Sequence, residues 1–186
     1  DVRNSRALLQ SCDILLMQLE IPIPAVVEAA RIASEAGATV VLNPAPYCEL
    51  PEEVFRHVSL FIPNRTELSS FSGVEVSDVG SAVRAAGVLF GKGVGKMIVT
   101  MGSRGSLIVE KDGHEFIPAL KVDAVDTTGA GDTYCGALCV ALAEGKSLPE
   151  AARFATASSA ISVTKMGAQT AIPSRAEIDA FLKSNS

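Results

Sequence analysis

Two kinds of hydrophobic pattern alternate along this chain. Short and nearly continuous apolar runs occupy residues 13–19, 38–42, 58–62 and 96–100. Runs of this kind are typical of strands that are buried on both faces of a sheet. Longer stretches with apolar residues at helical spacing lie between them. The alternation predicts an α/β fold with a mainly parallel sheet that is covered on both faces by helices.

The predicted helices rest on this spacing together with start and stop signals. In residues 22–36, Pro22 stands near the start and Gly37 follows the end. Two further apolar runs, residues 106–110 and 115–118, flank a turn of residues 111–114 with the Asp-Gly pair typical of a β-hairpin. The other predicted helices cover residues 4–11, 51–57, 67–72, 79–92, 133–144, 149–165 and 174–183.

Composition narrows the class of protein. The chain has 186 residues, 48% of them hydrophobic, with a net charge of −5 and no repeat or linker, so we expect one soluble domain over residues 1–186. The mild acidity argues against a nucleic-acid partner. No apolar run has membrane length and no secretory signal is visible, which favours a cytoplasmic protein without a membrane partner. We expect the four cysteines, Cys12, Cys48, Cys135 and Cys139, to be reduced core residues.

A glycine-rich turn stands out between a short extended segment, residues 121–125, and the predicted helix 133–144. Its sequence is Asp126-Thr127-Thr128-Gly129-Ala130-Gly131-Asp132. Small residues let backbone N–H groups converge there, and the first N–H groups of a helix attract anions such as phosphate. Asp132 could take a proton from an attacking hydroxyl. The alternative is a tight strand-to-helix turn in which Asp is only a cap.

Polar residues and glycines also follow the predicted strands, where ligands bind in open α/β sheets. They are Glu20, Asn43, Asn64, Glu67, Thr100, Gly102 and Gly105. Because Asn, Asp and Gly are turn formers, turn chemistry alone is the alternative explanation of this set.

These motifs resemble those of the ribokinase-like sugar kinases, the phosphofructokinase B type of carbohydrate kinase. The glycine turn, followed by Thr133 and by Gly136-Ala137-Leu138, resembles the signature of that family. Further similar segments are Met17-Gln18-Leu19-Glu20, Asn43-Pro44-Ala45-Pro46, Pro63-Asn64-Arg65-Thr66-Glu67, Val99-Thr100-Met101-Gly102-Ser103-Arg104-Gly105 and Gly167-Ala168-Gln169.

The resemblance covers essentially the whole chain and matches the larger, C-terminal portion of such an enzyme. It implies the ribokinase-like three-layer α/β/α fold with a mainly parallel sheet, lacking the N-terminal strands and the lid. It also implies that this chain holds the nucleotide-binding part of the enzyme and little of the sugar pocket.

The resemblance implies a role for each site residue. Asp132 would be the base that contacts the sugar hydroxyl, the backbone of Gly129, Ala130 and Gly131 the anion hole, and Glu20 a sugar contact. Glu67 would support Mg²⁺ through water. The remaining residues would bind the nucleotide (Asn64, Thr100, Gly102, Gly105, Thr156) or a monovalent cation, usually K⁺ (Asp126, Thr128, Ser162, Gly167). Thr170-Ala171 departs from the Pro-Ser that the family pattern leads us to expect.

The implied function is ATP-dependent phosphorylation of a sugar hydroxyl, most closely that of ribose to ribose 5-phosphate. The implied partners are ATP and a small sugar, with a homodimeric parent enzyme, and we expect the chain alone to be nearly inactive. Two alternatives remain open. One is a kinase of the same fold for fructose, keto-deoxygluconate or adenosine. The other is a nucleotide-binding module without catalysis.

Overall fold

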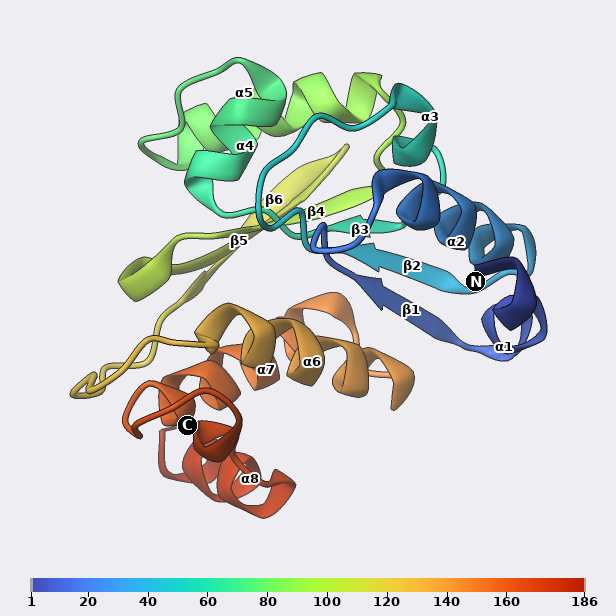
Figure 1. Ribbon diagram of the computed structural model, residues 1–186. Coiled ribbons are helices and arrows are strands. Elements are labelled where there is room, and N and C mark those ends of the chain that lie inside the picture. The colour runs from blue at the N-terminus through green and yellow to red at the C-terminus, as the bar shows by residue number, and fades with distance from the viewer. Residues whose placement is uncertain (1, 186) are drawn as a thin grey trace. The chain divides into compact units, whose positions relative to one another are not determined.

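A computed structural model describes residues 2–185 (Figure 1). Its six-stranded sheet has the order β1-β2-β3-β4-β5-β6, and the first four strands are parallel, with Met17 opposite Leu42 and Leu42 opposite Phe61. The predicted α/β class with a mainly parallel sheet is therefore confirmed. The strands are β1 (Ile14–Met17), β2 (Thr39–Leu42), β3 (Leu60–Phe61), β4 (Lys96–Thr100), β5 (Gly105–Glu110) and β6 (Gly113–Pro118).

Helices connect these strands and follow them. They are α1 (Arg6–Ser11), α2 (Ile23–Glu35), α3 (Glu52–Phe55), α4 (Arg65–Ser72), α5 (Val79–Gly91), α6 (Ala130–Ala143), α7 (Leu148–Ser162) and α8 (Arg175–Ser184), with short 3₁₀ helices η1 (Val2–Ser5), η2 (Gly102–Arg104) and η3 (Gln169–Ala171).

The described chain falls into two compact units. Unit 1 holds the residues up to Met101 together with Leu107–Phe116, and unit 2 holds Gly102–Ser106 and the residues from Ile117 onward. The boundary therefore runs within β5 and within β6. Whether the two units behave as the one domain expected from the sequence remains a prediction.

In unit 1, α2, α4 and α5 lie on the same face of the sheet (Figure 1). The strand order explains this arrangement, because β1 to β4 are added in one direction and crossover connections share one hand. The core between these helices and the strands contains fully buried Val26, Leu42, Phe61 and Leu89. In β4 the consecutive residues 97–99 are all fully buried, as the continuous apolar run predicts for a strand buried on both faces.

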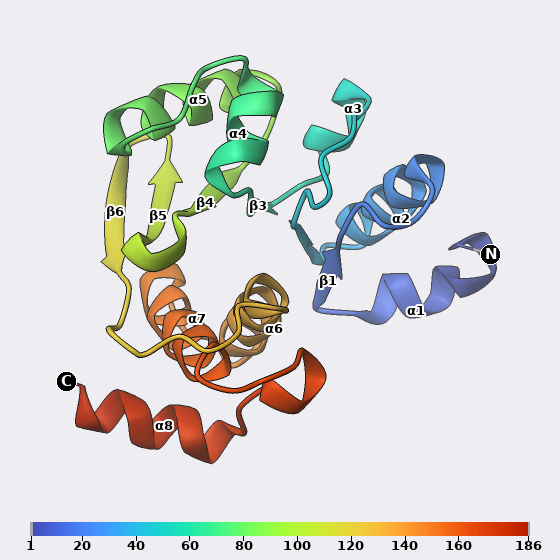
Figure 2. The ribbon, with the colours of Figure 1, turned by 60° about the vertical axis from the view of Figure 1, so that its left-hand side comes forward.

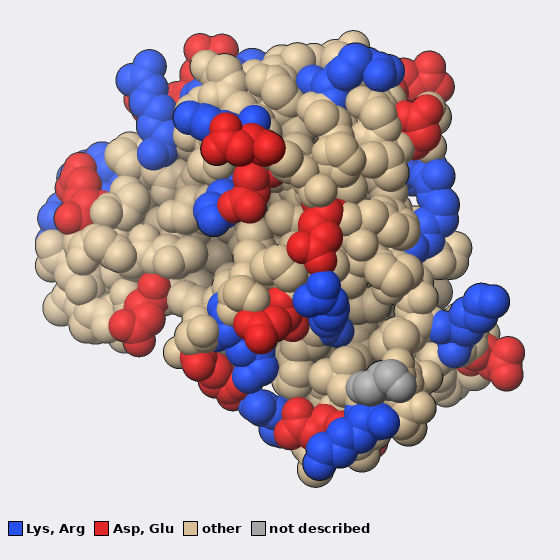
Figure 3. All heavy atoms as spheres, turned by 180° about the vertical axis from the view of Figure 1, so that it is seen from behind, with Lys and Arg blue, Asp and Glu red and all other residues tan. Residues whose placement is uncertain are grey.

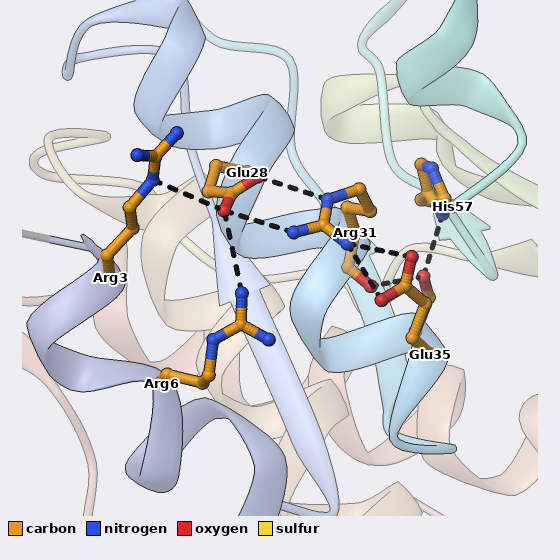
Figure 4. Close-up of polar contacts among 7 residues, drawn as sticks. Arg3, Arg6, Glu28, Arg31, Glu35 and His57 are labelled. Atoms are coloured by element: carbon orange, nitrogen blue, oxygen red, sulfur yellow. Dashed lines mark hydrogen bonds and ion pairs between the residues drawn. The ribbon is translucent and has the colours of Figure 1, made fainter.

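The N-terminal helices η1 and α1 pack beside α2, and charged side chains form ion pairs between them (Figure 4). The Glu28 carboxylate lies 3.0 Å from Arg31, 3.8 Å from Arg3 and 3.9 Å from Arg6, and Arg31 also pairs with Glu35 at 2.8 Å. The hydrogen bond from Arg31 is the main reason why the pKa of Glu28 is lowered. On the face in Figure 3, basic and acidic side chains are likewise interspersed. Exposed pairs of this kind contribute little stability each.

Unit 2 is built on α7, which packs against both α6 and α8 (Figure 2). Its sequence is rich in small residues, and nine of its fifteen residues are buried. Alanines such as Ala152 and Ala155 are completely inaccessible to solvent, so neighbouring backbones can approach closely. Phe154 and Leu138 supply the larger side chains of this core.

Several element boundaries differ from the predicted ones. β3 has only two residues instead of five, and the short extended segment predicted at residues 121–125 belongs to no strand of the sheet. The helix predicted from residue 133 begins at Ala130, because Gly129 adopts a left-handed conformation and caps it. β6 begins at Gly113, which shortens the predicted hairpin turn to Lys111-Asp112.

The cysteines and histidines also refine the sequence picture. All four cysteines are free, but only Cys135 is fully buried, which corrects the expectation that all four are core residues. His57 is half-buried, and its Nδ1 lies 2.8 Å from the hydroxyl of Ser34. Among residues 2–185, no helix has the length and apolar character that crossing a membrane requires.

Candidate active site

The glycine turn of unit 2 forms the start of α6. The N–H of Ala130 donates to the Thr127 carbonyl at 3.2 Å, and the first i→i−4 bond of the helix runs from Thr133 N–H to the Gly129 carbonyl at 2.9 Å. The N–H groups of residues 131 and 132 lie in this first turn, at the positive end of the helix dipole. Asp132 is exposed and occupies this first turn. The arrangement suits an approaching anion beside a carboxylate.

The two glycines of the turn serve different purposes. Gly129 has φ +72°, and a Cβ placed on it would lie 3.3 Å from the Cβ of Ala168. This position therefore needs glycine for the backbone itself. A Cβ placed on Gly131 would meet no heavy atom within 4 Å. The space beside Gly131 is open, and nothing in the described structure demands glycine there.

Asp126 ties the glycine turn to the loop after α7. Its Oδ1 accepts the Thr128 N–H at 2.9 Å and the Thr128 hydroxyl at 2.7 Å, and its Oδ2 accepts the Gly167 N–H at 2.9 Å. The bond from Gly167, followed by those from Thr128, holds the pKa of Asp126 below its ordinary value. Asp126 is therefore a fixed carboxylate that joins two segments 41 residues apart.

More hydrogen bonds hold these two segments together. The N–H groups of Val125 and Asp126 donate to the Val163 carbonyl at 2.7 and 3.1 Å, and the Ser159 hydroxyl donates to the Ala130 carbonyl at 3.2 Å. The Ser162 carbonyl accepts the Lys165 N–H at 3.1 Å, which leaves it a second lone pair. Backbone carbonyls and the Asp126 carboxylate make up a set of oxygen donors, and this chemistry fits a hard monovalent cation.

The segment predicted to bind nucleotide lies partly in unit 2. Gly102 and Gly105 have φ +59° and +118°, and a Cβ on Gly105 would lie 2.1 Å from the Ile117 carbonyl oxygen. Gly105 is thus required by the close approach of β6. Thr156, predicted to face the adenine, is buried in α7 and donates its hydroxyl to the Ala152 carbonyl at 2.8 Å.

In unit 1, Asn64 and Glu67 form a capping box at the start of α4. The Asn64 side chain accepts the Glu67 N–H at 2.9 Å, and the Glu67 carboxylate accepts the Asn64 N–H at 2.8 Å. Burial raises the pKa of Glu67, although the bond from Asn64 opposes this shift. Thr100 pairs with Asn64 in a parallel bridge, which brings the ends of β3 and β4 together. A buried carboxylate at this edge fits a Mg²⁺ ion that keeps its waters.

The other strand ends carry an architectural residue and an exposed one. Asn43 accepts from the Gln18 amide at 3.3 Å and donates to the Ile62 carbonyl at 2.8 Å, so its side chain joins three adjacent strand ends. Glu20, the predicted sugar contact, is exposed after β1. The parallel register places these residues along the same carboxyl edge of the sheet.

The predicted site residues therefore gather in two groups. Unit 1 brings together Asn64, Glu67 and Thr100 and places Glu20 and Asn43 at the same edge, whereas unit 2 holds the other predicted residues. The sequence reasoning missed two features of unit 2. One is Ser159, whose place one helical turn before Ser162 was the available signal. The other is the buried hydrogen bond between Ser106 and Tyr134, which no local sequence pattern predicts.

Comparisons with known proteins show which family the chain belongs to. Residues 2–175 match the model of the pfkB family carbohydrate kinases. The chain is 46% identical over 182 residues to a ribokinase of Haemophilus influenzae, an alignment that covers 98% of this chain and 60% of that protein. The chain thus spans about three-fifths of the length of this relative.

Solved structures give the same result. A ribokinase of Thermotoga maritima matches with a TM-score of 0.88 and 41% identity, over 96% of this chain and 59% of that one. The ribokinase of Arabidopsis thaliana, solved with ribose and ATP, matches with a TM-score of 0.94 and 31% identity, over 97% of this chain and 59% of that one. These likenesses confirm the ribokinase-like fold expected from the sequence, and the chain belongs to the pfkB family of carbohydrate kinases.

Proposed function

We propose that this chain supplies the nucleotide-binding and proton-accepting part of an ATP-dependent sugar kinase that converts ribose to ribose 5-phosphate. The choice of ribose is supported by relatives named ribokinase and by the ribose and ATP bound in the Arabidopsis thaliana structure. The observation that carries the proposal is the start of α6. There an open position at Gly131 and the carboxylate of Asp132 share the first helical turn.

The proposed reaction is a direct transfer. Asp132 accepts the proton of the sugar hydroxyl while the hydroxyl oxygen forms a bond to the γ-phosphorus of ATP. The bond from that phosphorus to the bridging oxygen of ADP breaks. Backbone N–H groups at the start of α6 then stabilise the charge on the transferring phosphoryl group. A base of this kind accounts for roughly 10²- to 10⁴-fold in rate.

Two ions fit the donor groups on the chain. Glu67, through water, would hold a Mg²⁺ ion, which neutralises phosphate charge when it is bound with the nucleotide. Asp126, with the carbonyls of Thr128, Ser162 and Gly167, would hold K⁺. Since Asp126 already fixes the glycine turn to the loop after α7, a cation bound there would tighten the same junction.

Calorimetric titration of Mg-ATP into this chain, with and without K⁺, tests the nucleotide part of the proposal. We expect binding that strengthens when K⁺ is added and that is lost when Gly131 is replaced by valine. A folded chain that binds no Mg-ATP in either condition would contradict the proposed nucleotide site. This titration needs no turnover, so it remains valid if the chain alone is nearly inactive.

The sugar requires a second experiment. A coupled assay with the longer parent protein should show turnover with ribose and much less with fructose, keto-deoxygluconate or adenosine. The variant Asp132→Asn should bind Mg-ATP normally and lose turnover. If the parent preferred another substrate, the chemistry at Asp132 would stand and only the assignment of ribose would fail. Full activity of Asp132→Asn would contradict its role as the base.

A further inference from the structure

A buried pair of hydroxyl groups lies close to the candidate site in unit 2. The Oγ of Ser106 and the phenolic oxygen of Tyr134 are 3.0 Å apart, and either can be the donor. Ser106 is 1% exposed and Tyr134 is 6% exposed. Burial also raises the pKa of Tyr134, so its hydroxyl stays protonated at neutral pH. The pair is therefore a neutral hydrogen bond that is shielded from water.

The hydrogen bond between Ser106 and Tyr134 connects two segments that both carry predicted site residues. Ser106 directly follows Gly105, the last residue of the segment predicted to bind nucleotide, and Tyr134 lies two residues after Asp132 in α6. The two are 28 residues apart in sequence. The segment Gly102–Ser106 belongs to unit 2, as α6 does. The parts of the chain on either side of this segment, β4 and most of β5, belong to unit 1.

We propose that Ser106 and Tyr134 are positioning residues that fix the first turn of α6 against the nucleotide segment. The bond would hold the Gly131 N–H and the Asp132 carboxylate at a set distance from the bound nucleotide. The inference deepens the proposed function and rests on it. Neither residue touches a substrate in this role, because both side chains are buried.

The hydrogen bond between these two buried hydroxyl groups restricts the position of α6 for two reasons. A buried hydroxyl without a partner loses its hydration and gains nothing in return, so both groups favour the arrangement in which they meet. The tyrosine ring has few rotatable bonds and is packed on its sides, so its hydroxyl marks a defined point in space. A core made only of apolar contacts at this place would tolerate small sliding of α6, since such contacts are not directional.

The test uses Tyr134→Phe, Ser106→Ala and the double variant in this chain. Tyr134→Phe keeps the ring and removes only the hydroxyl, so the fold should survive. Tyr47→Phe removes the hydroxyl of the other tyrosine, which is half-exposed, and is the matched control. Two quantities are measured for each: amide hydrogen exchange in peptides that cover residues 129–134 and 102–106, and the affinity for Mg-ATP.

We expect each single variant to exchange about five- to tenfold faster in these two segments and to bind Mg-ATP more weakly by a similar factor, the worth of one net hydrogen bond. The double variant should be no worse than the poorer single variant, because no hydroxyl is then left unpaired. Tyr47→Phe should match the wild type in both measurements.

Three outcomes would overturn the inference. The first is unchanged amide exchange in residues 129–134 of the single variants. The second is faster exchange in that segment with unchanged Mg-ATP affinity. The third is a double variant whose loss of Mg-ATP affinity equals the sum of the losses in the two single variants. Failure of the proposed function looks different, because it would show as absent Mg-ATP binding by the wild type itself. In that case the positioning role would fall with it, whatever the variants do.

Discussion

Gly129 and Gly131 are two residues apart, and they differ in whether the backbone conformation requires glycine. Gly129 needs its positive φ and lies close to Ala168, whereas the Cβ position of Gly131 is open. In Gly131→Ala we expect stability to stay the same or to rise by about 0.5–1 kcal/mol, because alanine favours a helix over glycine. Mg-ATP binding should weaken, since the methyl group fills the proposed anion site. Thermal unfolding and calorimetric titration measure the two effects.

Gly129→Ala is the matched comparison for this prediction. A left-handed alanine costs roughly 1–2 kcal/mol, so this variant should lose both stability and binding. The contrast between the variants separates the two uses of glycine. If Gly131→Ala bound Mg-ATP as tightly as the wild type, the space beside Gly131 could not be the phosphate site.

Glu67 gives a prediction about pH. Burial raises its pKa above the ordinary value of 4.5, so the folded chain holds this proton more tightly than the unfolded chain does. Stability from this group is greatest below the unfolded pKa and is lost as pH rises through the folded pKa. At pH 7, Glu67→Gln should therefore be at least as stable as the wild type, since its amide oxygen can still accept the Asn64 N–H.

The same variant should bind Mg-ATP more weakly, because the carboxylate proposed to support Mg²⁺ is gone. Thermal midpoints from pH 4 to 8, compared with Mg-ATP titrations at pH 7, check both parts. The stability difference between variant and wild type should shrink toward pH 4. A variant that is destabilised at pH 7 and binds normally would show that Glu67 acts only as a cap.

At the scale of residues, the sequence identified most of the side chains that the structure gathers in each unit. It did so because Gly, Asn and Asp must stand at turns and caps, where local chemistry is visible in the order of residues. The contacts of Ser159 and Tyr134 were not predictable in this way. Their partners lie 29 and 28 residues away, and only tertiary packing brings them together.

Between elements, the junction of the glycine turn with the loop after α7 depends on Asp126. Hydrogen bonds from Gly167 and Thr128 lower its pKa, so its stabilising effect is present above the unfolded pKa and is lost as pH falls through the folded value. Asp126→Asn removes the charge at every pH. We expect this variant to unfold at a lower temperature at pH 7 and to lose the effect of K⁺ on Mg-ATP binding.

Asp123→Asn is the control for this prediction, because Asp123 is an exposed carboxylate three residues earlier in the same segment. It should behave like the wild type at pH 7. The stability difference between Asp126→Asn and the wild type should narrow as pH falls toward 3. An undiminished K⁺ effect in Asp126→Asn would place the cation elsewhere.

Element types were easier to predict than element ends. The strands and long helices could be predicted from the spacing of apolar residues, because that spacing reflects which side chains are buried. β3 came out short, with only Leu60 and Phe61 in the strand, although Asn64 pairs again with Thr100 in the same register in an isolated bridge. The early start of α6 depended on the conformation of Gly129, which the sequence permits without requiring.

For the whole molecule, the boundary between the two units has a consequence for unfolding. It runs within β5 and β6, so each of these strands belongs to both units. Unfolding of either unit would therefore remove part of β5 and part of β6. We therefore expect one cooperative transition in scanning calorimetry, with a ratio of calorimetric to van't Hoff enthalpy of about 1. Two resolved transitions would show that the units are independent domains.

The fold class was predictable at this scale and the sugar was not. Buried strands that alternate with amphipathic helices restrict the architecture strongly, and the family motifs restrict it further. Glu20 is the one sugar contact besides Asp132 that the sequence suggested, and the chain spans 60% of the length of its Haemophilus influenzae relative. Substrate choice is therefore a property to be measured.

The buried tyrosine of α6 also has an optical consequence. The chain has no tryptophan and only two tyrosines, so its tyrosine fluorescence comes from Tyr47 and Tyr134. Replacing Tyr47 by phenylalanine would leave a protein with a single tyrosine emitter, two residues from Asp132. The intensity and lifetime of that emission would then report on the surroundings of the candidate base without any attached dye.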